Sequence, residues 1–109
     1  MLNEEMIYDL VHGLRGIFAQ NVLQIILYGS VARNEETEES DIDIAIIVDD
    51  ITSIDTRERF MEWNAEMDMK YNRVFSIVDI DREQMERWSN ILPFYKNIKK
   101  EGVVLWKAA

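Results

Sequence analysis

Two short apolar runs rich in β-branched residues constrain the fold of this chain most strongly. The first is Val22–Tyr28 and the second is Asp41–Val48. Runs of this length and composition predict buried strands. Because side chains alternate along a strand, Asp41 and Asp43 share one face of the second run with the apolar residues Ala45 and Ile47. We therefore expect the beginning of this strand to meet solvent or a ligand, and its end to lie in the core.

Helical patterns surround the two runs and predict a sheet covered by helices. Before and between the runs, periodicity and capping residues predict an N-terminal helix capped by Asn3 and a helical turn at residues 31–34. After the second run they predict a helix from Asp55 to about Tyr71 with an Asp55–Glu58 capping box, and then a strand over Arg73–Ile80. The rest of the chain is predicted to form a short helix capped by Asp81, a helix from Pro93 to Lys100 and a strand over Val103–Trp106. We expect an α+β or α/β domain with a mixed sheet, and the length of 109 residues favours a single domain over residues 1–109. Connectivity alone does not fix the strand order.

The net charge of −9 comes from one acidic segment. Residues 34–56 hold nine Asp and Glu residues and no Lys or Arg, whereas 12 acidic residues balance 12 basic residues elsewhere. This segment is either a solvated acidic face or a cation site. The acidic balance argues against direct nucleic-acid binding, because contacts to phosphates need Lys or Arg.

Other features of the composition exclude further classes of protein. Without cysteine the chain has no disulfides, no thiolate metal ligands and no thiol nucleophile. No apolar run reaches the ~18 residues that span a bilayer, and the N-terminus is acidic where a signal peptide is basic. We therefore expect a cytoplasmic protein with no membrane partner.

Asp41 and Asp43 form a candidate metal site. On a strand both side chains point to the same side, with Cα atoms about 6.5–7 Å apart. Two carboxylates at this separation repel each other unless a cation lies between them or one is protonated. Hard oxygen ligands suit Mg²⁺ or Mn²⁺, and the lack of nearby His or Cys disfavours zinc.

Gly29 and Ser30 form a candidate anion cradle. They follow a buried strand and precede a predicted helical turn, a junction that exposes backbone N–H groups to an anion. Arg33 lies one turn further on, where it can contact a phosphate or make a structural ion pair. A divalent-cation site beside an anion cradle is what metal-dependent phosphoryl or nucleotidyl transfer requires.

The spacing of these residues resembles a known family. Gly29-Ser30, then ten residues that include Ala32-Arg33 and end at Ser40, then Asp41-Ile42-Asp43, is similar to the signature of the DNA polymerase beta-like nucleotidyltransferases. The size of the chain resembles the minimal nucleotidyltransferase branch.

This resemblance implies an α+β fold of the polymerase beta-like nucleotidyltransferase type. It implies Mg²⁺ on Asp41 and Asp43, and ATP or another NTP bound through Gly29, Ser30, Arg33 and Ser40. A hydroxyl attacks the α-phosphate and pyrophosphate leaves. Minimal members resemble antitoxins paired with a helical HEPN-type partner, and some transfer AMP from ATP to a tyrosine of that partner.

The chain departs from the family pattern at two places. Asn34 stands where a glycine is common, a mild change because Asn tolerates left-handed backbone. A third carboxylate is expected on a later strand, where our register places Ser76, whereas Asp79 has the opposite parity and points to the other face unless a bulge intervenes. The alternative function is therefore a weakly active or inactive module that neutralises a partner by binding. We also expect a separate partner or a homo-oligomer, because little chain is left to position an acceptor.

Overall fold

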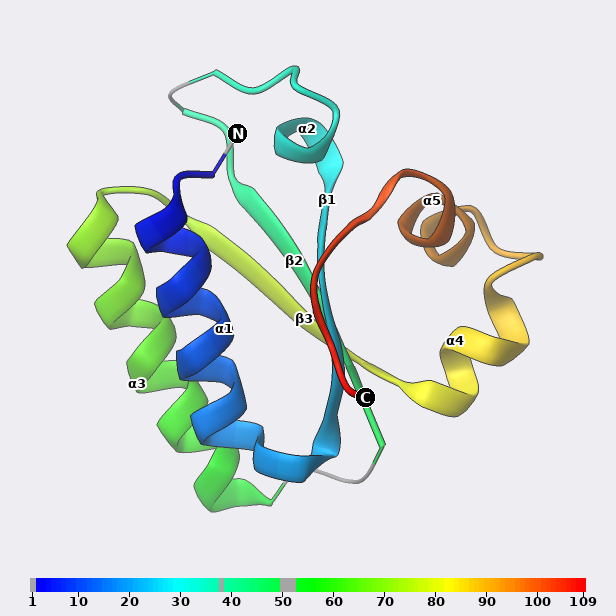
Figure 1. The fold of residues 1–109 in the computed structure, drawn as a ribbon, viewed down its shortest axis with the longest axis horizontal. Coiled ribbons are helices and arrows are strands. Elements are labelled where there is room, and N and C mark those ends of the chain that lie inside the picture. The colour runs from blue at the N-terminus through cyan, green and yellow to red at the C-terminus, as the bar shows by residue number, and fades with distance from the viewer. Residues whose placement is uncertain (1, 38, 50–52) are drawn as a thin grey trace.

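A four-stranded sheet with helices on both faces forms the molecule in the computed structural model, which describes residues 2–37, 39–49 and 53–109 (Figure 1). The elements in chain order are α1 (Glu4–Phe18), a short 3-10 helix (Ala19–Asn21), β1 (Val22–Tyr28), α2 (Gly29–Ala32), β2 (Ile42–Val48), α3 (Ile54–Tyr71), β3 (Phe75–Asp81), α4 (Arg82–Trp88), α5 (Pro93–Glu101) and β4 (Val103–Lys107). The strand order in the sheet is β3-β2-β1-β4.

The sheet is mixed, as the sequence predicts. Strand β1 pairs antiparallel with both β2 and β4, and β2 pairs parallel with β3. Parallel neighbours need a long crossover connection, and here α3 supplies it. The α+β class with a mixed sheet is therefore confirmed.

Strand β2 separates two hydrophobic clusters, because its side chains alternate between the faces of the sheet. Ile42, Ile44 and Ile46 belong to the cluster beneath α1 and α3. Ala45 and Ile47 belong to the cluster that includes residues of β3 and α5 on the other face. The predicted alternation is correct, and Asp43 begins the face whose later residues are buried.

The helix ends show which capping predictions hold. Asn3 accepts a hydrogen bond from the backbone N–H of Met6, and Asp81 accepts one from that of Glu83, so both predicted caps are confirmed. The predicted Asp55–Glu58 capping box is wrong. Ser53 caps α3 instead: it has extended backbone, and its side chain accepts from the N–H of Thr56, which leaves Asp55 inside the first turn. No helix within the described ranges is long and apolar enough to cross a membrane.

The start of the third strand also differs from the prediction. Strand β3 begins at Phe75, two residues later than the predicted Arg73. The reason is Asn72, which ends α3 in the left-handed conformation and requires a short turn before the strand can pair.

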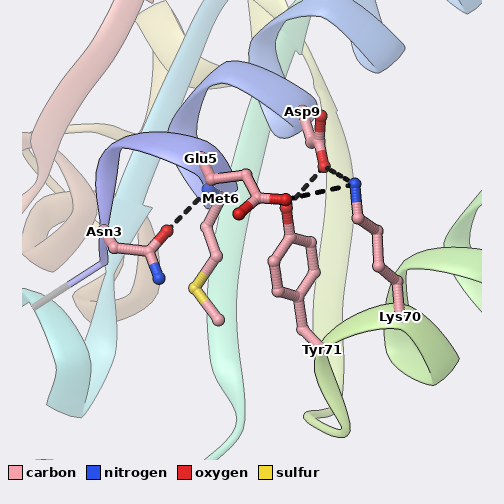
Figure 2. Close-up of polar contacts among 6 residues, drawn as sticks. All are labelled: Asn3, Glu5, Met6, Asp9, Lys70 and Tyr71. Carbon is pink, nitrogen blue, oxygen red and sulfur yellow. Dashed lines mark hydrogen bonds and ion pairs between the residues drawn. The ribbon is translucent and has the colours of Figure 1, made fainter.

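Helices α1 and α3 pack closely and are linked by a polar cluster near Asp9 (Figure 2). A Cβ atom added at Gly13 would collide with the indole of Trp63, so a glycine is needed for this close approach. Asp9 accepts hydrogen bonds from Tyr71 and from Lys70, the latter at 2.7 Å, and Lys70 also lies 3.5 Å from Glu5. The hydrogen bond from Lys70 lowers the pKa of Asp9 most, and the hydrogen bond from Tyr71 lowers it further.

The lowered pKa of Asp9 predicts a pH-dependent contribution to stability. A depressed carboxyl pKa stabilises the fold above the unfolded-state pKa, and this stabilisation is lost as the pH falls through the folded-state pKa. We expect Asp9→Asn to lower the melting temperature at pH 7 by up to about 4 °C. Thermal unfolding followed by circular dichroism measures this, with Glu62→Gln, an exposed acid on α3, as the control. If Asp9→Asn lowered the melting temperature equally at pH 7 and at pH 2, the charge of Asp9 would not be the cause.

Candidate active site

The glycine–serine bend and Asp43 meet at one end of the sheet. Tyr28 ends β1 and pairs with Asp43 in the antiparallel ladder, so Gly29 and Ser30 follow directly beside that carboxylate. A Cβ atom added at Gly29 would collide with Oδ2 of Asp43, and the backbone of Gly29 has φ +76°. Both the space and the conformation therefore require glycine at this position.

The bend continues into the single turn of α2. This helix spans Gly29–Ala32, two residues earlier than the predicted turn at residues 31–34. The amides of a first helical turn have no acceptor within the helix, so they are available to an anion. The backbone N–H of Glu35 donates to the carbonyl of Ser30 at 2.9 Å and closes the loop. Asn34 adopts φ +62°, the left-handed conformation that the common glycine would provide.

The two aspartates form an electrostatically unfavourable pair in the absence of a cation. Asp43 is half-buried and Asp41 is exposed. Burial raises the pKa of Asp43, the negative charge of Asp41 raises it further, and the positive charge of Arg33 opposes both. The pKa of the Tyr28 phenol is likewise raised, by burial and then by the charge of Asp43. Hard carboxylate oxygens with uncompensated charge are a donor set that fits Mg²⁺ or Mn²⁺.

Ser76 and Asp79 lie on opposite faces of β3. Ser76 is the partner of Asp43 in the parallel ladder and therefore lies on the same face of the sheet. Asp79 has the opposite parity, and its Oδ2 lies 3.0 Å from the guanidinium of Arg57 on α3. In the part of the chain that the structure describes, no group of three or more His, Cys, Asp and Glu side chains could hold a metal ion. Asp43 and Ser76 thus share a face of the sheet, and the charge of Asp41 is near enough to act on Asp43.

Arg33 makes ion pairs in this structure. Its Nε atom lies 3.1 Å from Glu35, and its Nη1 atom lies 3.5 Å from Glu101 of α5. The sequence allows Arg33 either a phosphate contact or a structural ion pair, and the structure contains the ion pair. The side chain is 42% exposed, and a phosphate contact stays a prediction.

Ser40 positions the chain that enters β2. Its hydroxyl accepts a hydrogen bond from the N–H of Thr37 at 2.9 Å, and its carbonyl accepts one from Arg73 at 3.0 Å. These bonds fix the loop just before Asp41, and a role of Ser40 in nucleotide binding stays a prediction. Of the acidic segment, Glu38 and Asp50 lie outside the described residues.

A small pocket that the sequence does not predict lies beside the bend. It has a volume of about 200 Å³ and is lined by residues of the bend and of α5, namely Tyr28, Gly29, Arg33, Phe94, Asn97 and Glu101. The sequence signal for it is the aromatic pair Phe94-Tyr95 that follows the helix-opening Pro93.

Comparison with known sequences finds one family and a full-length relative. A sequence model of the family described as "Polymerase beta, Nucleotidyltransferase" matches residues 14–108. A protein of Methanocaldococcus jannaschii, named as a candidate protein adenylyltransferase, is 32% identical over 108 residues, which cover 97% of this chain and 100% of the relative.

Comparison with solved structures finds the same fold. A spectinomycin adenyltransferase from Enterococcus, solved with ATP and spectinomycin, superposes with a TM-score of 0.78 at 13% identity, covering 99% of this chain and 57% of that one. A complex of a tri-AMPylated HEPN toxin from Shewanella oneidensis with its MNT antitoxin gives a TM-score of 0.58 at 16% identity, covering 98% of this chain and 74% of that one. The TM-scores show a shared fold, and at identities this low the likeness shows the fold alone.

The raised pKa of Asp43 predicts that this residue lowers the stability of the ligand-free protein. A carboxyl whose pKa is raised by folding opposes folding above its folded-state pKa, and the opposition fades as the pH falls through that pKa. We expect Asp43→Asn to raise the melting temperature in EDTA at pH 7 by a few degrees, and less at pH 3. Asp79→Asn is the matched control, because it removes a paired aspartate from the opposite face. A lower melting temperature of Asp43→Asn at pH 7 would contradict this reasoning.

Proposed function

Because the chain belongs to the polymerase beta nucleotidyltransferase family, we propose that it transfers AMP from ATP to a hydroxyl of a partner protein and that the reaction depends on Mg²⁺. The single observation that supports the proposal best is the contact of the Asp43 carboxylate with the backbone of Gly29. It supports the proposal because the carboxylate that we propose to bind the cation lies beside the amides that we propose to hold a phosphate chain.

The residues of the chain have distinct roles in this proposal. Asp41 and Asp43 would hold the Mg²⁺ ion, with Mn²⁺ as a possible substitute. When bound, the ion supplies charge neutralisation for the triphosphate and for the pyrophosphate leaving group. The backbone amides of Gly29 and Ser30 and the hydroxyl of Ser30 would donate hydrogen bonds to phosphate oxygens. The oxygen of the acceptor hydroxyl forms a bond to the α-phosphorus, and the bond between that phosphorus and the bridging oxygen of pyrophosphate breaks.

Removal of the proton from the attacking hydroxyl is the step that this chain supports least. A serine hydroxyl is a poor base and a poor metal ligand at neutral pH, and Ser76 lies where a third carboxylate would adjoin Asp43. We therefore expect slow transfer, or transfer that a group on the partner assists. The same observation favours a second candidate function, in which the chain binds nucleotide and neutralises a partner by binding alone.

The proposed acceptor is a tyrosine of a HEPN-type toxin, with this chain acting as its antitoxin. Support comes from the name of the M. jannaschii relative, which denotes a protein substrate, and from the AMPylated HEPN toxin that accompanies the structural neighbour from S. oneidensis. A phenol is also a more acidic hydroxyl than that of serine or threonine, so it loses its proton more readily without a strong base.

Transfer of labelled AMP tests the proposed reaction directly. The chain, a HEPN-type partner, Mg²⁺ and ATP labelled at the α-phosphate should yield labelled partner. We expect the double variant Asp41→Asn/Asp43→Asn to lose at least 100-fold in rate, because the cation site loses its charge. Asp79→Asn, whose carboxylate faces α3, should retain the wild-type rate. Undiminished labelling by the double variant would refute the assignment.

An acid restored at position 76 distinguishes the two candidate functions. The register puts residue 76 on the strand next to Asp43, and neighbouring strands are about 4.8 Å apart. We expect Ser76→Asp to raise the transfer rate tenfold or more, whereas the uncharged Ser76→Asn should not. A higher transfer rate in Ser76→Asp but not in Ser76→Asn would support the interpretation that the site is weak because it lacks the third carboxylate. No gain would show that residue 76 does not limit the reaction.

A further inference from the structure

The small pocket between the bend and α5 has a composition suited to an aromatic heterocycle. We propose that it binds the adenine base of the nucleotide, stacked on Phe94 and recognised at its polar edge by Asn97 and Glu101. This inference rests on the proposed function, because it adds a base subsite to the phosphate and cation sites described above.

The position of the pocket relative to the bend supports this assignment. Gly29 belongs both to the wall of the pocket and to the contact with Asp43. Tyr28, also in the wall, is the ladder partner of Asp43. A nucleotide whose phosphates lie on the bend must place its ribose and base in one of the adjoining hollows, and this pocket begins at the bend itself.

Phe94 provides a fixed aromatic surface in the pocket wall. The residue is 45% exposed, so much of its surface is open to solvent. The ring packs edge-on against Tyr28, with centroids 5.8 Å apart, and against Tyr95, with centroids 5.3 Å apart. Because two neighbours hold the ring and a large part of it stays accessible, a planar base could stack on it with little loss of side-chain entropy.

Asn97 and Glu101 offer polar groups on the same side of α5. Asn97 lies three residues after Phe94 and Glu101 lies four residues after Asn97, spacings that align side chains along one helix face. Adenine presents an amino donor beside a ring-nitrogen acceptor, and the amide of Asn matches both. Among the described residues, the Asn97 side chain has no hydrogen-bond partner.

Glu101 and Arg33 make the pocket favour adenine over guanine. The Glu101 carboxylate only accepts hydrogen bonds, so it suits the amino group of adenine and repels the O6 carbonyl of guanine. Arg33, which could otherwise bind that carbonyl, is paired with Glu35 and Glu101. In this proposal the amino group of adenine donates to acceptors of the wall, namely the Glu101 carboxylate and the Asn97 amide oxygen.

Binding of two probes by isothermal titration tests the base subsite apart from the phosphate site. Mg–ATP contains the base, whereas Mg–tripolyphosphate contains the phosphate chain alone. We expect Phe94→Ala to weaken Mg–ATP binding by about 5- to 100-fold, the range that base–aromatic stacking gives, and to leave tripolyphosphate binding unchanged. Phe94→Tyr should retain affinity for ATP. Ile91→Ala, an exposed apolar residue in the preceding loop, is the control and should change neither affinity.

Base selectivity gives a second measurement that does not depend on Phe94. The wild-type chain should bind ATP more tightly than GTP, and Asn97→Leu, an exposed position whose replacement is compatible with the helix, should reduce that preference. If ATP binds but neither variant changes its affinity, the base subsite is wrong while the proposed function stands. If the wild-type chain binds neither ATP nor tripolyphosphate, the proposed function fails, and the base subsite fails with it.

Discussion

The contact between the Asp43 carboxylate and the backbone of Gly29 is the constraint on which the site depends. It joins the end of β1 to the beginning of β2, two segments separated by the acidic loop. The antiparallel ladder pairs Tyr28 with Asp43, so Gly29 follows directly beside the carboxylate, and its missing side chain leaves room for that carboxylate. Without that contact, the proposed cation site and the proposed anion site would be separate features of the sheet edge.

The cost of this arrangement appears in the electrostatics of Asp43. Burial and the nearby charge of Asp41 both raise its pKa, so the folded chain holds a carboxylate that would be more easily ionised in the unfolded state. A bound divalent cation would reverse the sign of this effect, because it interacts favourably with both charges. A site of this kind is destabilising when empty and stabilising when filled, which is a common property of functional carboxylates.

Much of the fold follows from local patterns in the sequence, because those patterns reflect forces that act over a few residues. Alternation along β2 correctly assigns Ile44 and Ala45 to opposite clusters, and the parity of β3 correctly separates Ser76 from Asp79. The start of α3 was predicted wrongly because Ser and Asp are similar capping residues, and only the backbone conformation decides which of the two caps.

The features that the sequence does not reveal depend on contacts between distant segments. The strand order depends on which strands pair, and the pairing of Arg33 with Glu101 depends on how α5 lies against the sheet. The pocket beside the bend has the same origin, because its walls come from β1, α2 and α5. No periodicity or spacing encodes such a meeting of elements, although the aromatic residue after Pro93 hints at a surface that could bind a ring.

The strict requirement for glycine at position 29 makes the two halves of the site unequal under mutation. Any side chain there meets both a carboxylate and an unsuitable backbone angle, so a change would need compensating shifts in the neighbouring strand. Position 76 lies in a regular ladder, where the backbone imposes no comparable requirement for one residue type. Under the proposed function, a lineage could therefore gain or lose catalytic strength at residue 76 over evolutionary time while the bend proposed to bind phosphate stays unchanged.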